Sequence, residues 1–425
     1  MSDTWQSIDT SSLRGLAEAD RIAPSLYYDP KLFEAELDRI FYKTWVWVAH
    51  ESELPNPGDF RTTTIGRQPV IVVRDKSGAV NVLQNRCRHR GATVCEEHKG
   101  NAKGFTCPYH SWTYALDGTL RAFPYGDGYE GVCDKTDLPL EKLRVGIYQG
   151  LIFASFNAEI EPLEDFLGGA KPWIDLFMKQ GAGYPVKANG EHKFRFKGNW
   201  KIQLENTTDL YHFPVVHKSW LKSIDDETSA VITSFMTSDK AFCRSLGNGH
   251  SLAVLVPDLV DLDQDDGAPL PERFNELIKQ LSERHTAEEV RRIVRSLMGV
   301  GFNLNLFPNL ALSMAFFRVL RPISAEETEI RHVALGMDGG PEEANRVRLR
   351  IHEHFQGPFG FGSPDDAEAW ERVQRGSHAG PDTPILVNRG LNRETTAPNG
   401  EKTAHATDET GMREAYAQWR KMMEA

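Results

Sequence analysis

The periodicity of hydrophobic and polar positions changes near residue 156. Between residues 45 and 156, short apolar runs alternate with turn residues, as in 68–75 (QPVIVVRD) and 79–85 (AVNVLQN), which flank a Lys-Ser-Gly turn. A second pair of runs, 111–116 and 119–123, flanks Asp117-Gly118. Asp-Gly between two such runs is a strong hairpin signal. This part of the chain therefore predicts a domain of short β-hairpins.

After residue 156 the hydrophobic positions recur over longer segments. The pattern predicts an α+β domain with helices near 163–179, 271–299, 341–355 and 409–424 and strands at 192–198, 230–257 and 301–336. An earlier helix is predicted to begin at Asp29-Pro30, because Asp is a good N-cap and Pro suits the first helical position. Its apolar stripe consists of Phe33, Leu37, Ile40 and Phe41. We expect this N-terminal arm to pack on another domain.

Composition limits the class of protein. The chain has 425 residues, is 40% hydrophobic and is long enough for two or three domains. It contains no apolar run of about 18 residues, and its first twelve residues are polar, so we expect a soluble cytoplasmic protein without membrane contact. The net charge of −11 argues against a nucleic-acid partner. The acidic stretch 257–271 is expected to be a surface loop and a lid candidate.

Two ligand pairs stand out within the β-rich part. Cys87 and His89 are one residue apart, Cys107 and His110 are two apart, and seventeen residues (90–106) separate the pairs. Two thiolates and two imidazoles are the ligand set of a Rieske [2Fe-2S] centre, in which two histidines replace two cysteines on one iron. The sequence thus predicts a centre that passes on single electrons, held by loops between hairpins.

A Cys2His2 zinc site is the structural alternative, because zinc accepts the same ligands. Zinc motifs usually keep their cysteines together and their histidines together, whereas here each pair is mixed. Cys95 and His98 also form a C-x-x-H pattern, which we interpret as surface. Cys95, Cys133 and Cys243 show no disulfide spacing and are expected to be packing residues.

A second group of metal-type side chains lies at 205–217 (ENTTDLYHFPVVH). Asp209 and His212 are three positions apart and are expected to share a helix face. Pro214 is expected to bend the chain, so that His217 converges on the same centre as His212. Two histidines with one carboxylate form the facial triad of non-heme Fe(II) oxygenases, which leaves positions open for oxygen and substrate.

The carboxylate of such a triad has a candidate source at 359–372 (FGFGSPDDAEAWER). Ser363 and Pro364 resemble a helix start, and Asp365 and Asp366 fall in the first turn. The same two aspartates would be favourable there simply by complementing the helix dipole. The residues alone leave both readings open.

Together these motifs resemble the large (α) subunit of aromatic-ring-hydroxylating Rieske non-heme iron dioxygenases, over nearly the whole chain. The family's cluster motif matches Cys87, His89, Cys107 and His110, and its N-W-K and E-N-x-x-D-x-x-H-x4-H motifs match 199–201 and 205–217. The resemblance implies a [2Fe-2S] cluster on the first four residues and mononuclear Fe(II) on His212, His217 and Asp366, with Asp365 as the alternative. It also implies that Asp209 bridges His212 and His110.

The resemblance further implies the domain plan. Residues 1–44 would form an arm that packs with the catalytic domain, residues 45–157 an all-β Rieske domain, and residues 158–425 a helix-grip (START-like) catalytic domain. In that fold an antiparallel sheet wraps around a long helix and a substrate cavity.

The implied activity is that of the terminal oxygenase of a multicomponent system. It would add O2 to an aromatic ring as a cis-dihydrodiol, with electrons from NAD(P)H delivered by a ferredoxin, a flavin reductase or both. The implied assembly is a head-to-tail homotrimer, or α3β3 with a small β subunit. A domain of this size has a radius of gyration of about 13 Å, so electron transfer between subunits is expected. Arg86, Arg88 and Arg90 surround the first ligand pair and would raise the cluster potential or attract an acidic ferredoxin.

Other functions stay open at this point. A Rieske monooxygenase of the salicylate hydroxylase or O-demethylase type is the main alternative, followed by a pure electron carrier and a lipid-binding helix-grip module. The pattern favours an aromatic acid of the benzoate, salicylate or terephthalate type, with Arg244 and Arg318 as candidate carboxylate partners. The residues expected by position to line the pocket are Asn206, Leu210, Val215, Phe302 and Phe361.

Overall fold

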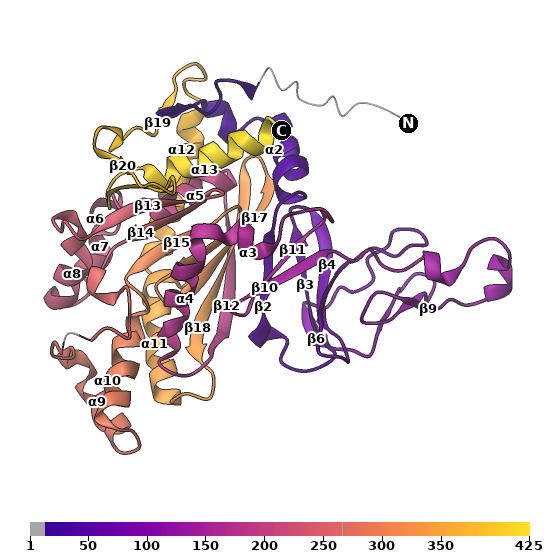
Figure 1. Cartoon of the computed structure of the whole chain (residues 1–425), viewed down its shortest axis with the longest axis horizontal. Helices are drawn as coiled ribbons and strands as arrows, with labels where there is room; N and C mark the ends of the chain where they lie inside the picture. The colour runs from indigo at the N-terminus through magenta and orange to yellow at the C-terminus, as the bar shows by residue number, and fades with distance from the viewer. Residues whose placement is uncertain (1–12, 266) are drawn as a thin grey trace. The chain divides into compact units, whose positions relative to one another are not determined.

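The computed structural model describes residues 13–265 and 267–425. The chain forms two compact units, a smaller one at 41–166 and a larger one that combines residues up to 40 with those from 167 onward (Figure 1). The prediction about the first twelve residues falls outside the described part. None of the described helices is long and apolar enough to cross a membrane.

The smaller unit consists almost entirely of short antiparallel strands. They form a four-stranded sheet in the order β5-β4-β3-β6 and two three-stranded sheets, β7-β8-β9 and β10-β11-β2. Their bounds are β2 Val46–His50, β3 Asp59–Ile65, β4 Gln68–Arg74, β5 Val80–Gln84, β6 Lys99–Asn101, β7 Phe105–Thr106, β8 Thr113–Tyr114, β9 Leu120–Ala122, β10 Arg144–Tyr148 and β11 Leu151–Ser155. Both predicted hairpins, β4–β5 and β8–β9, are confirmed.

The larger unit contains one nine-stranded antiparallel sheet, in the order β12-β18-β17-β16-β15-β14-β13-β21-β20. The strands are β12 Val186–Phe196, β13 Phe242–Gly247, β14 His250–Val254, β15 Phe302–Leu306, β16 Leu310–Ser313, β17 Phe316–Ser324, β18 Glu327–Met337, β20 Thr395–Thr396 and β21 Lys402–His405. A separate small pair joins β1 (Arg21–Ile22) to β19 (Ile385–Leu386). The expected fold class, a small all-β domain plus a larger domain with an antiparallel sheet and helices, is confirmed.

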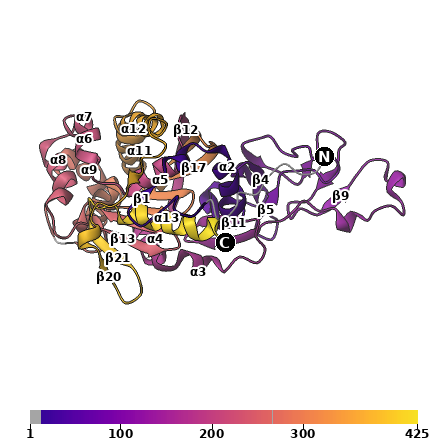
Figure 2. The ribbon, with the colours of Figure 1, turned by 90° about the horizontal axis from the view of Figure 1, so that it is seen from above.

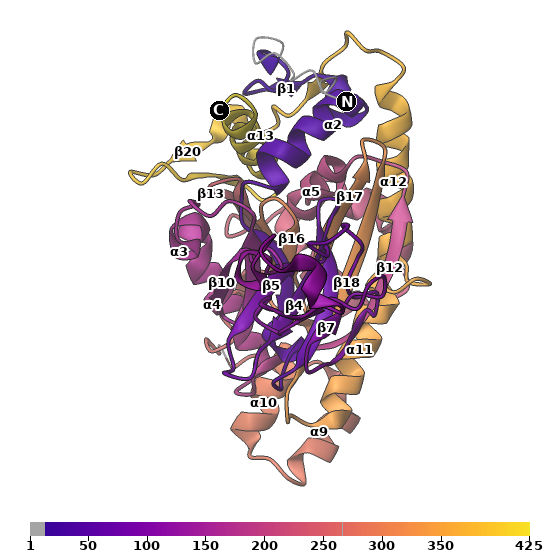
Figure 3. The same ribbon diagram turned by 90° about the vertical axis from the view of Figure 1, so that its right-hand side faces the viewer.

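Helices cover this sheet. Helix α13 (Thr410–Met423) packs on β13 and β14, α5 (Trp200–Thr208) packs on β15, and α11 (Glu342–Gln356) packs on β18. Helix α12 (Gly362–Ser377) follows α11 and lies beyond its end in Figure 3, and the two helices overlap in the view from above (Figure 2). The shorter helices are α3 Leu163–Leu167, α4 Lys171–Met178, α6 Phe213–Val216, α7 Lys218–Leu221, α8 Asp226–Thr233, α9 Asn275–Ser282 and α10 Ala287–Arg295.

The N-terminal arm contributes α2 (Pro30–Glu36), which begins as predicted: the Asp29 side chain accepts the backbone N–H of Lys31. The buried Glu36 carboxylate accepts hydrogen bonds from the side chains of Lys201, Trp200 and Trp419. These contacts tie the arm to α5 and α13 and orient the helix that precedes the histidines.

Three predicted elements differ in the structure. The helix expected at 163–179 is interrupted at Gly168-Gly169, because glycine disfavours a helix interior. The helix expected at 271–299 is two helices, the second of which starts at a capping box made by Thr286 and Glu289. The strand expected from 230 begins only at 242, because Asp225 caps helix α8 by accepting the N–H of Thr228.

Candidate metal centres

The two cysteine–histidine loops of the smaller unit have the same backbone geometry. In each, the cysteine carbonyl accepts the N–H of the residue four positions on, at 2.9 Å for Gly91 and 3.0 Å for Ser111. Each cysteine N–H also donates 2.8 Å to the carbonyl five positions on. Gly91 and Ser111 both have positive φ, 76° and 59°, which turns the chain back tightly. The two loops therefore present their ligands as a matched pair.

The four predicted cluster residues come together. Nδ1 of His89 lies 3.2 Å from Nδ1 of His110. Cys87 and Cys107 are buried in the core of the unit, whereas both histidines are partly exposed. Burial, together with the adjacent Cys87 thiol and against the pull of backbone amides, raises the pKa of the Cys107 thiol. A buried thiol pair beside a more exposed imidazole pair fits a diiron cluster with unequal ends.

The spacing also bears on the zinc alternative. Among the described residues, only His212, His217 and Asp366 form a group of three or more His, Cys, Asp or Glu ligand atoms all within 4.8 Å of one another. The ligand atoms of the two cysteines and two histidines are spread more widely than this limit. A single zinc would draw its four ligands to within about 2.0–2.3 Å of one point.

In the larger unit, two separate segments bring the second group of ligands together. Nε2 of His212 and Nε2 of His217 lie 3.4 and 3.2 Å from the same oxygen, Oδ1 of Asp366. Asp366 is the fifth residue of α12, the helix predicted to start near Ser363, and so lies just after its first turn. Asn206 also approaches this oxygen, with its Nδ2 at 3.2 Å. Nδ1 of His217 is buried without a hydrogen-bond partner among the described residues.

The connection between Asp209 and His212 differs from the prediction. Helix α5 ends at Thr208, so Asp209 and His212 do not share a helix face. Instead the Asp209 carboxylate accepts the backbone N–H groups of Tyr211 and His212, which forms a turn. The same carboxylate lies 3.3 Å from Nδ1 of His212. Asp209 thus orients the imidazole through a turn. Pro214 lies in the first turn of the next short helix, which begins at Phe213, rather than bending a continuous helix.

Asp366 supplies a buried negative charge at this site. Burial would raise the pKa of this carboxyl, but hydrogen bonds to His212 and His217 hold it far below its usual range. Burial likewise acts to lower the pKa of His212, and the neighbouring Asp209 and Asp366 overcome it and raise the value to about 9. Two imidazoles and one ionised carboxylate on one face match the donor set of a non-heme iron site.

A cavity of about 40 Å³ adjoins these ligands. Of the residues expected to line it, Asn206 and Leu210 do so. Val215 is 75% exposed on the short helix α6, and Phe361 is 42% exposed beside His354. Phe302 is buried but packs against Trp173 and Phe177. These three side chains do not line this cavity, because position along the chain does not show which way a side chain points.

Further lining residues come from β15, β16 and β17, from the turn between β16 and β17, and from α11, and apart from Arg318 the sequence did not single them out. They are Asn303, Ser313, Met314, Arg318, Phe355 and Gln356. One signal was present in β15, where Asn303 and Asn305 alternate with apolar residues and so face one side of the sheet. Their side chains donate to the carbonyls of Thr207 and Leu204, which fixes α5 against the sheet. Arg244, the other candidate cation, lies on β13 and donates to Thr403 instead of lining the cavity.

The remaining cysteines follow the prediction only in part. Cys95 and Cys243 are buried, whereas Cys133 is exposed and is therefore not a packing residue. The buried Cys95 also corrects its assignment to the surface, since it belongs to the core cluster of the smaller unit.

Comparison with known proteins agrees with both centres. Residues 44–137 match the Rieske [2Fe-2S] domain and residues 185–425 the ring hydroxylating alpha subunit catalytic domain. The chain is 34% identical to the anthranilate 1,2-dioxygenase large subunit of Acinetobacter baylyi, over 89% of this chain and 82% of that protein. It is 32% identical to the toluate 1,2-dioxygenase subunit alpha of Pseudomonas putida, over 85% and 80%.

The fold also matches a solved structure, naphthalene 1,2-dioxygenase with indole bound in the active site. The TM-score is 0.81 and the identity 28%, covering 96% of this chain and 94% of that one. Together the matches exclude a zinc module, a pure electron carrier and a lipid-binding module. The chain belongs to the family of ring-hydroxylating dioxygenase alpha subunits, with a Rieske [2Fe-2S] domain and a catalytic domain that binds mononuclear iron.

Proposed function

We propose that this chain is the terminal oxygenase of a multicomponent system that dihydroxylates an aromatic carboxylic acid. The reaction adds both atoms of O2 to the ring and consumes two electrons and two protons, with NAD(P)H as donor through a reductase, a ferredoxin or both. The names of the anthranilate and toluate relatives favour a ring that carries a carboxylate. The benzoate, salicylate and terephthalate types are the candidate classes.

The observation that carries this proposal is Arg318, a buried cation in the wall of the metal-site cavity. Its guanidinium is held by two bonds, from Nε to His332 at 3.0 Å and from Nη2 to Gln356 at 3.1 Å. Neither partner is an anion, and Nη1 has no hydrogen bond among the described residues. Burial lowers the pKa of Arg318, and the charge of Asp366 opposes that shift. A substrate carboxylate would supply the missing counter-ion.

The chain's own residues divide the remaining tasks. Cys87, His89, Cys107 and His110 would hold the cluster, and His212, His217 and Asp366 the iron. When bound, the two groups supply electrons and activate O2. Asp209 holds the His212 ring from its Nδ1 side, and Asn206 holds Asp366 through one carboxylate oxygen. Both contacts fix ligand directions before substrate arrives.

Partner contacts extend the proposal. We infer a homotrimer or an α3β3 assembly with a small β subunit, in which Asp209 meets His110 of a neighbouring chain. Arg86, Arg88 and Arg90 are exposed around the first cluster loop and offer a surface to an acidic ferredoxin. Co-expression of Cys107→Ser with Asp366→Ala tests the assembly, because each variant keeps the centre that the other lacks. Partial activity of verified mixed oligomers supports transfer between subunits, and its absence contradicts it.

The substrate class is tested with purified reductase and a panel of aromatic acids and their neutral amides, scored by isolated product. We expect a dihydrodiol from at least one acid; a product with a single added hydroxyl would indicate a monooxygenase instead. Arg318→Gln should raise KM for the acid at least tenfold, as expected for loss of a charge-assisted bond of about 1.5–3 kcal/mol. Arg318→Lys should restore part of this loss, and Arg244→Gln, outside the cavity, should leave KM unchanged. Turnover of amides alone would reject the aromatic-acid assignment.

A further inference from the structure

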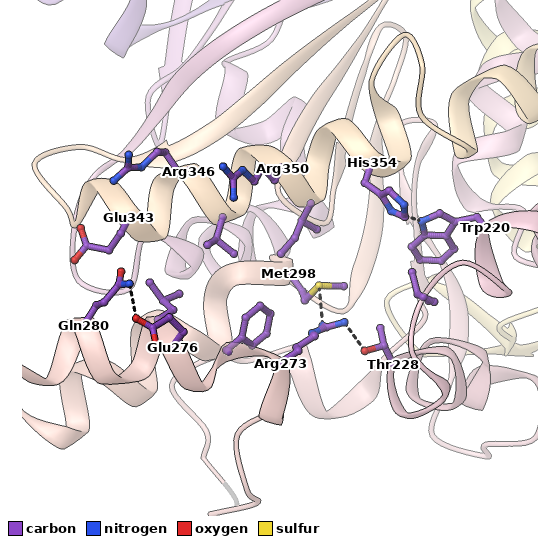
Figure 4. A pocket seen from close by; sticks show the side chains of 15 residues that line it. Trp220, Thr228, Arg273, Glu276, Gln280, Met298, Glu343, Arg346, Arg350 and His354 are labelled. Carbon is purple, nitrogen blue, oxygen red and sulfur yellow. Dashed lines mark hydrogen bonds between the residues drawn. The ribbon is translucent and has the colours of Figure 1, made fainter.

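A second, larger cavity of about 720 Å³ lies in the catalytic unit, lined partly by α11 and α9 (Figure 4). Helix α11 forms one long side, and α9 with the turn before it forms the other. Trp220 and His354 close one end, where the indole Nε1 donates to His354 Nδ1 at 3.2 Å. We call this space the outer cavity. Its volume falls within the range of about 300–1,000 Å³ that is typical of small-molecule sites.

The lining of the outer cavity combines an apolar surface with cations that lack counter-ions. Its apolar residues are Ile224, Phe274, Leu277, Met298, Val347 and Ile351. Arg346 and Arg350 lie one turn apart on α11, and neither has an ion pair or hydrogen bond among the described residues. Arg273, in contrast, is paired with Asp225 at 3.0 Å. Like charges at this spacing repel each other, so an anion between them would be stabilising.

The acids that line the outer cavity are gathered at its far end and already have partners. Glu276 accepts a hydrogen bond from Gln280 at 2.9 Å (Figure 4). Glu343 is paired with Arg284. They lie away from Trp220 and His354. Arg346 lies at the acidic end, near Glu343, whereas Arg350 lies further along α11 toward His354 (Figure 4). The protein as a whole has a net charge of −11.

One layer of aromatic side chains separates the outer cavity from the metal site. The rings of Trp220 and Phe355 are 4.4 Å apart, and Phe355 lies 5.1 Å from the ring of His217. Phe355 also lines the cavity beside Asp366, whereas Trp220 lines the outer cavity. Movement of these two rings would join the two spaces.

The volumes of the two cavities differ in whether they can hold an aromatic ring. The cavity at the metal site measures about 40 Å³, whereas a cavity of roughly 150 Å³ is known to accommodate benzene. An aromatic acid therefore cannot enter the metal-site cavity unless side chains move. The outer cavity has room for it without such movement.

We propose that the outer cavity is a binding site for the aromatic carboxylate, which Arg346 and Arg350 hold by its charge before Trp220 and Phe355 move and admit the ring to the metal site. The proposal rests on the aromatic-acid function proposed above. The apolar lining would take the ring, and the two guanidinium groups would take the carboxylate. Both arginines are exposed. We therefore expect them to increase the rate at which the acid is captured and not the rate of the chemical step.

The test uses the complete oxygenase with the Arg346→Gln/Arg350→Gln double variant. Arg372→Gln is the matched control, an exposed arginine of α12 outside both cavities. For the best acid of the panel, we expect kcat/KM of the double variant to fall roughly tenfold, the lower end of effects from electrostatic steering, while kcat stays near wild type. The corresponding amide should show no change. Added salt should lower kcat/KM of the wild type for the acid, but not that of the double variant.

A second measurement avoids turnover. Calorimetry of the oxidised enzyme without reductant should show that the same acid binds the wild type and Arg372→Gln, and binds the double variant at least fivefold more weakly. Unchanged kcat/KM and unchanged binding in the double variant would overturn the role of the outer cavity. If instead no acid binds or is turned over by the wild type, the aromatic-acid function itself fails, and the two failures are distinguishable.

Discussion

The carboxylate of Asp209 lies 3.3 Å from Nδ1 of His212, while Nε2 of the same ring faces Asp366 at 3.4 Å. One imidazole therefore contacts two carboxylates, one through each nitrogen. Asp366 therefore lies on the side of the ring where His212 would bind the metal. Asp209 fixes the orientation of the ring from the opposite side, which faces away from the metal.

Replacing Asp209 with Asn should separate metal binding from electron transfer. Asn keeps the size of the side chain and an oxygen that accepts the N–H groups of Tyr211 and His212, so the turn should persist. We expect both metal centres at wild-type occupancy and a large loss of NAD(P)H-driven product. Stopped-flow oxidation of the reduced cluster in the presence of substrate and O2 would show the slow step. Near-normal rates would reduce Asp209 to a replaceable support of His212.

The two adjacent aspartates should differ in metal binding. Asp366 is buried and faces both histidines, whereas Asp365 is half-buried and its pKa is raised by burial. Asp366→Ala should lose mononuclear iron and product but keep the visible spectrum of the cluster. Asp365→Ala, the matched control, should keep about three irons per chain, two of them in the cluster. Metal analysis with the reverse result would make Asp365 the ligand.

Tyr114 should influence the cluster potential. Its buried hydroxyl lies 3.3 Å from Sγ of Cys87 and accepts the N–H of Arg88 at 3.0 Å. A hydroxyl that donates to a ligand sulfur raises the reduction potential of an iron–sulfur centre. Tyr114→Phe should keep the cluster and lower its potential in a redox titration. Tyr129→Phe, which changes a nearby ring without a sulfur contact, should leave the potential unchanged, and equal potentials in all three proteins would exclude the effect.

His352 should make the protein less stable in acid. Both of its ring nitrogens are buried without hydrogen-bond partners, and it faces His192, His332 and Arg318. Burial, with the charges of His192 and Arg318, lowers its pKa from 6.5 to about 3. A lowered folded-state pKa gives stability that is complete above pH 6.5 and is lost as the pH falls toward 3. At pH 5 the loss is about 2 kcal/mol.

His352→Phe should therefore stabilise the catalytic unit. We expect a gain of about 1–2 kcal/mol near neutral pH from removal of the unsatisfied nitrogens and a larger gain at pH 5. Thermal unfolding of proteins with equal iron content at pH 5 and 7.5 measures both. The control is His378→Phe, a half-exposed histidine bonded to Glu326. If the thermal stability of the wild type and of His352→Phe depended equally on pH, His352 would not be the group that destabilises the protein in acid.

The sequence by itself determined the features that depend on nearby residues. The turn residues at 76–78 and 117–118 specify hairpins, because only a few backbone conformations reverse a chain in two or three residues. The N-cap of α2 is equally local. The members of each Cys–His pair, and His212 with His217, lie only a few positions apart, so both ligand groups were visible as motifs.

Only the tertiary structure decided which distant residues complete the catalytic site. Asp366 meets Asn206 across 160 positions, and nothing local to α12 separates it from Asp365. Arg318 and Arg244 both lie on strands of one sheet, yet only Arg318 faces the metal-site cavity. Side chains alternate between the two faces of a strand, so register and packing against α5 and α11 determine which of them reach the cavity. That choice depends on the packing of the whole domain, which no local pattern encodes.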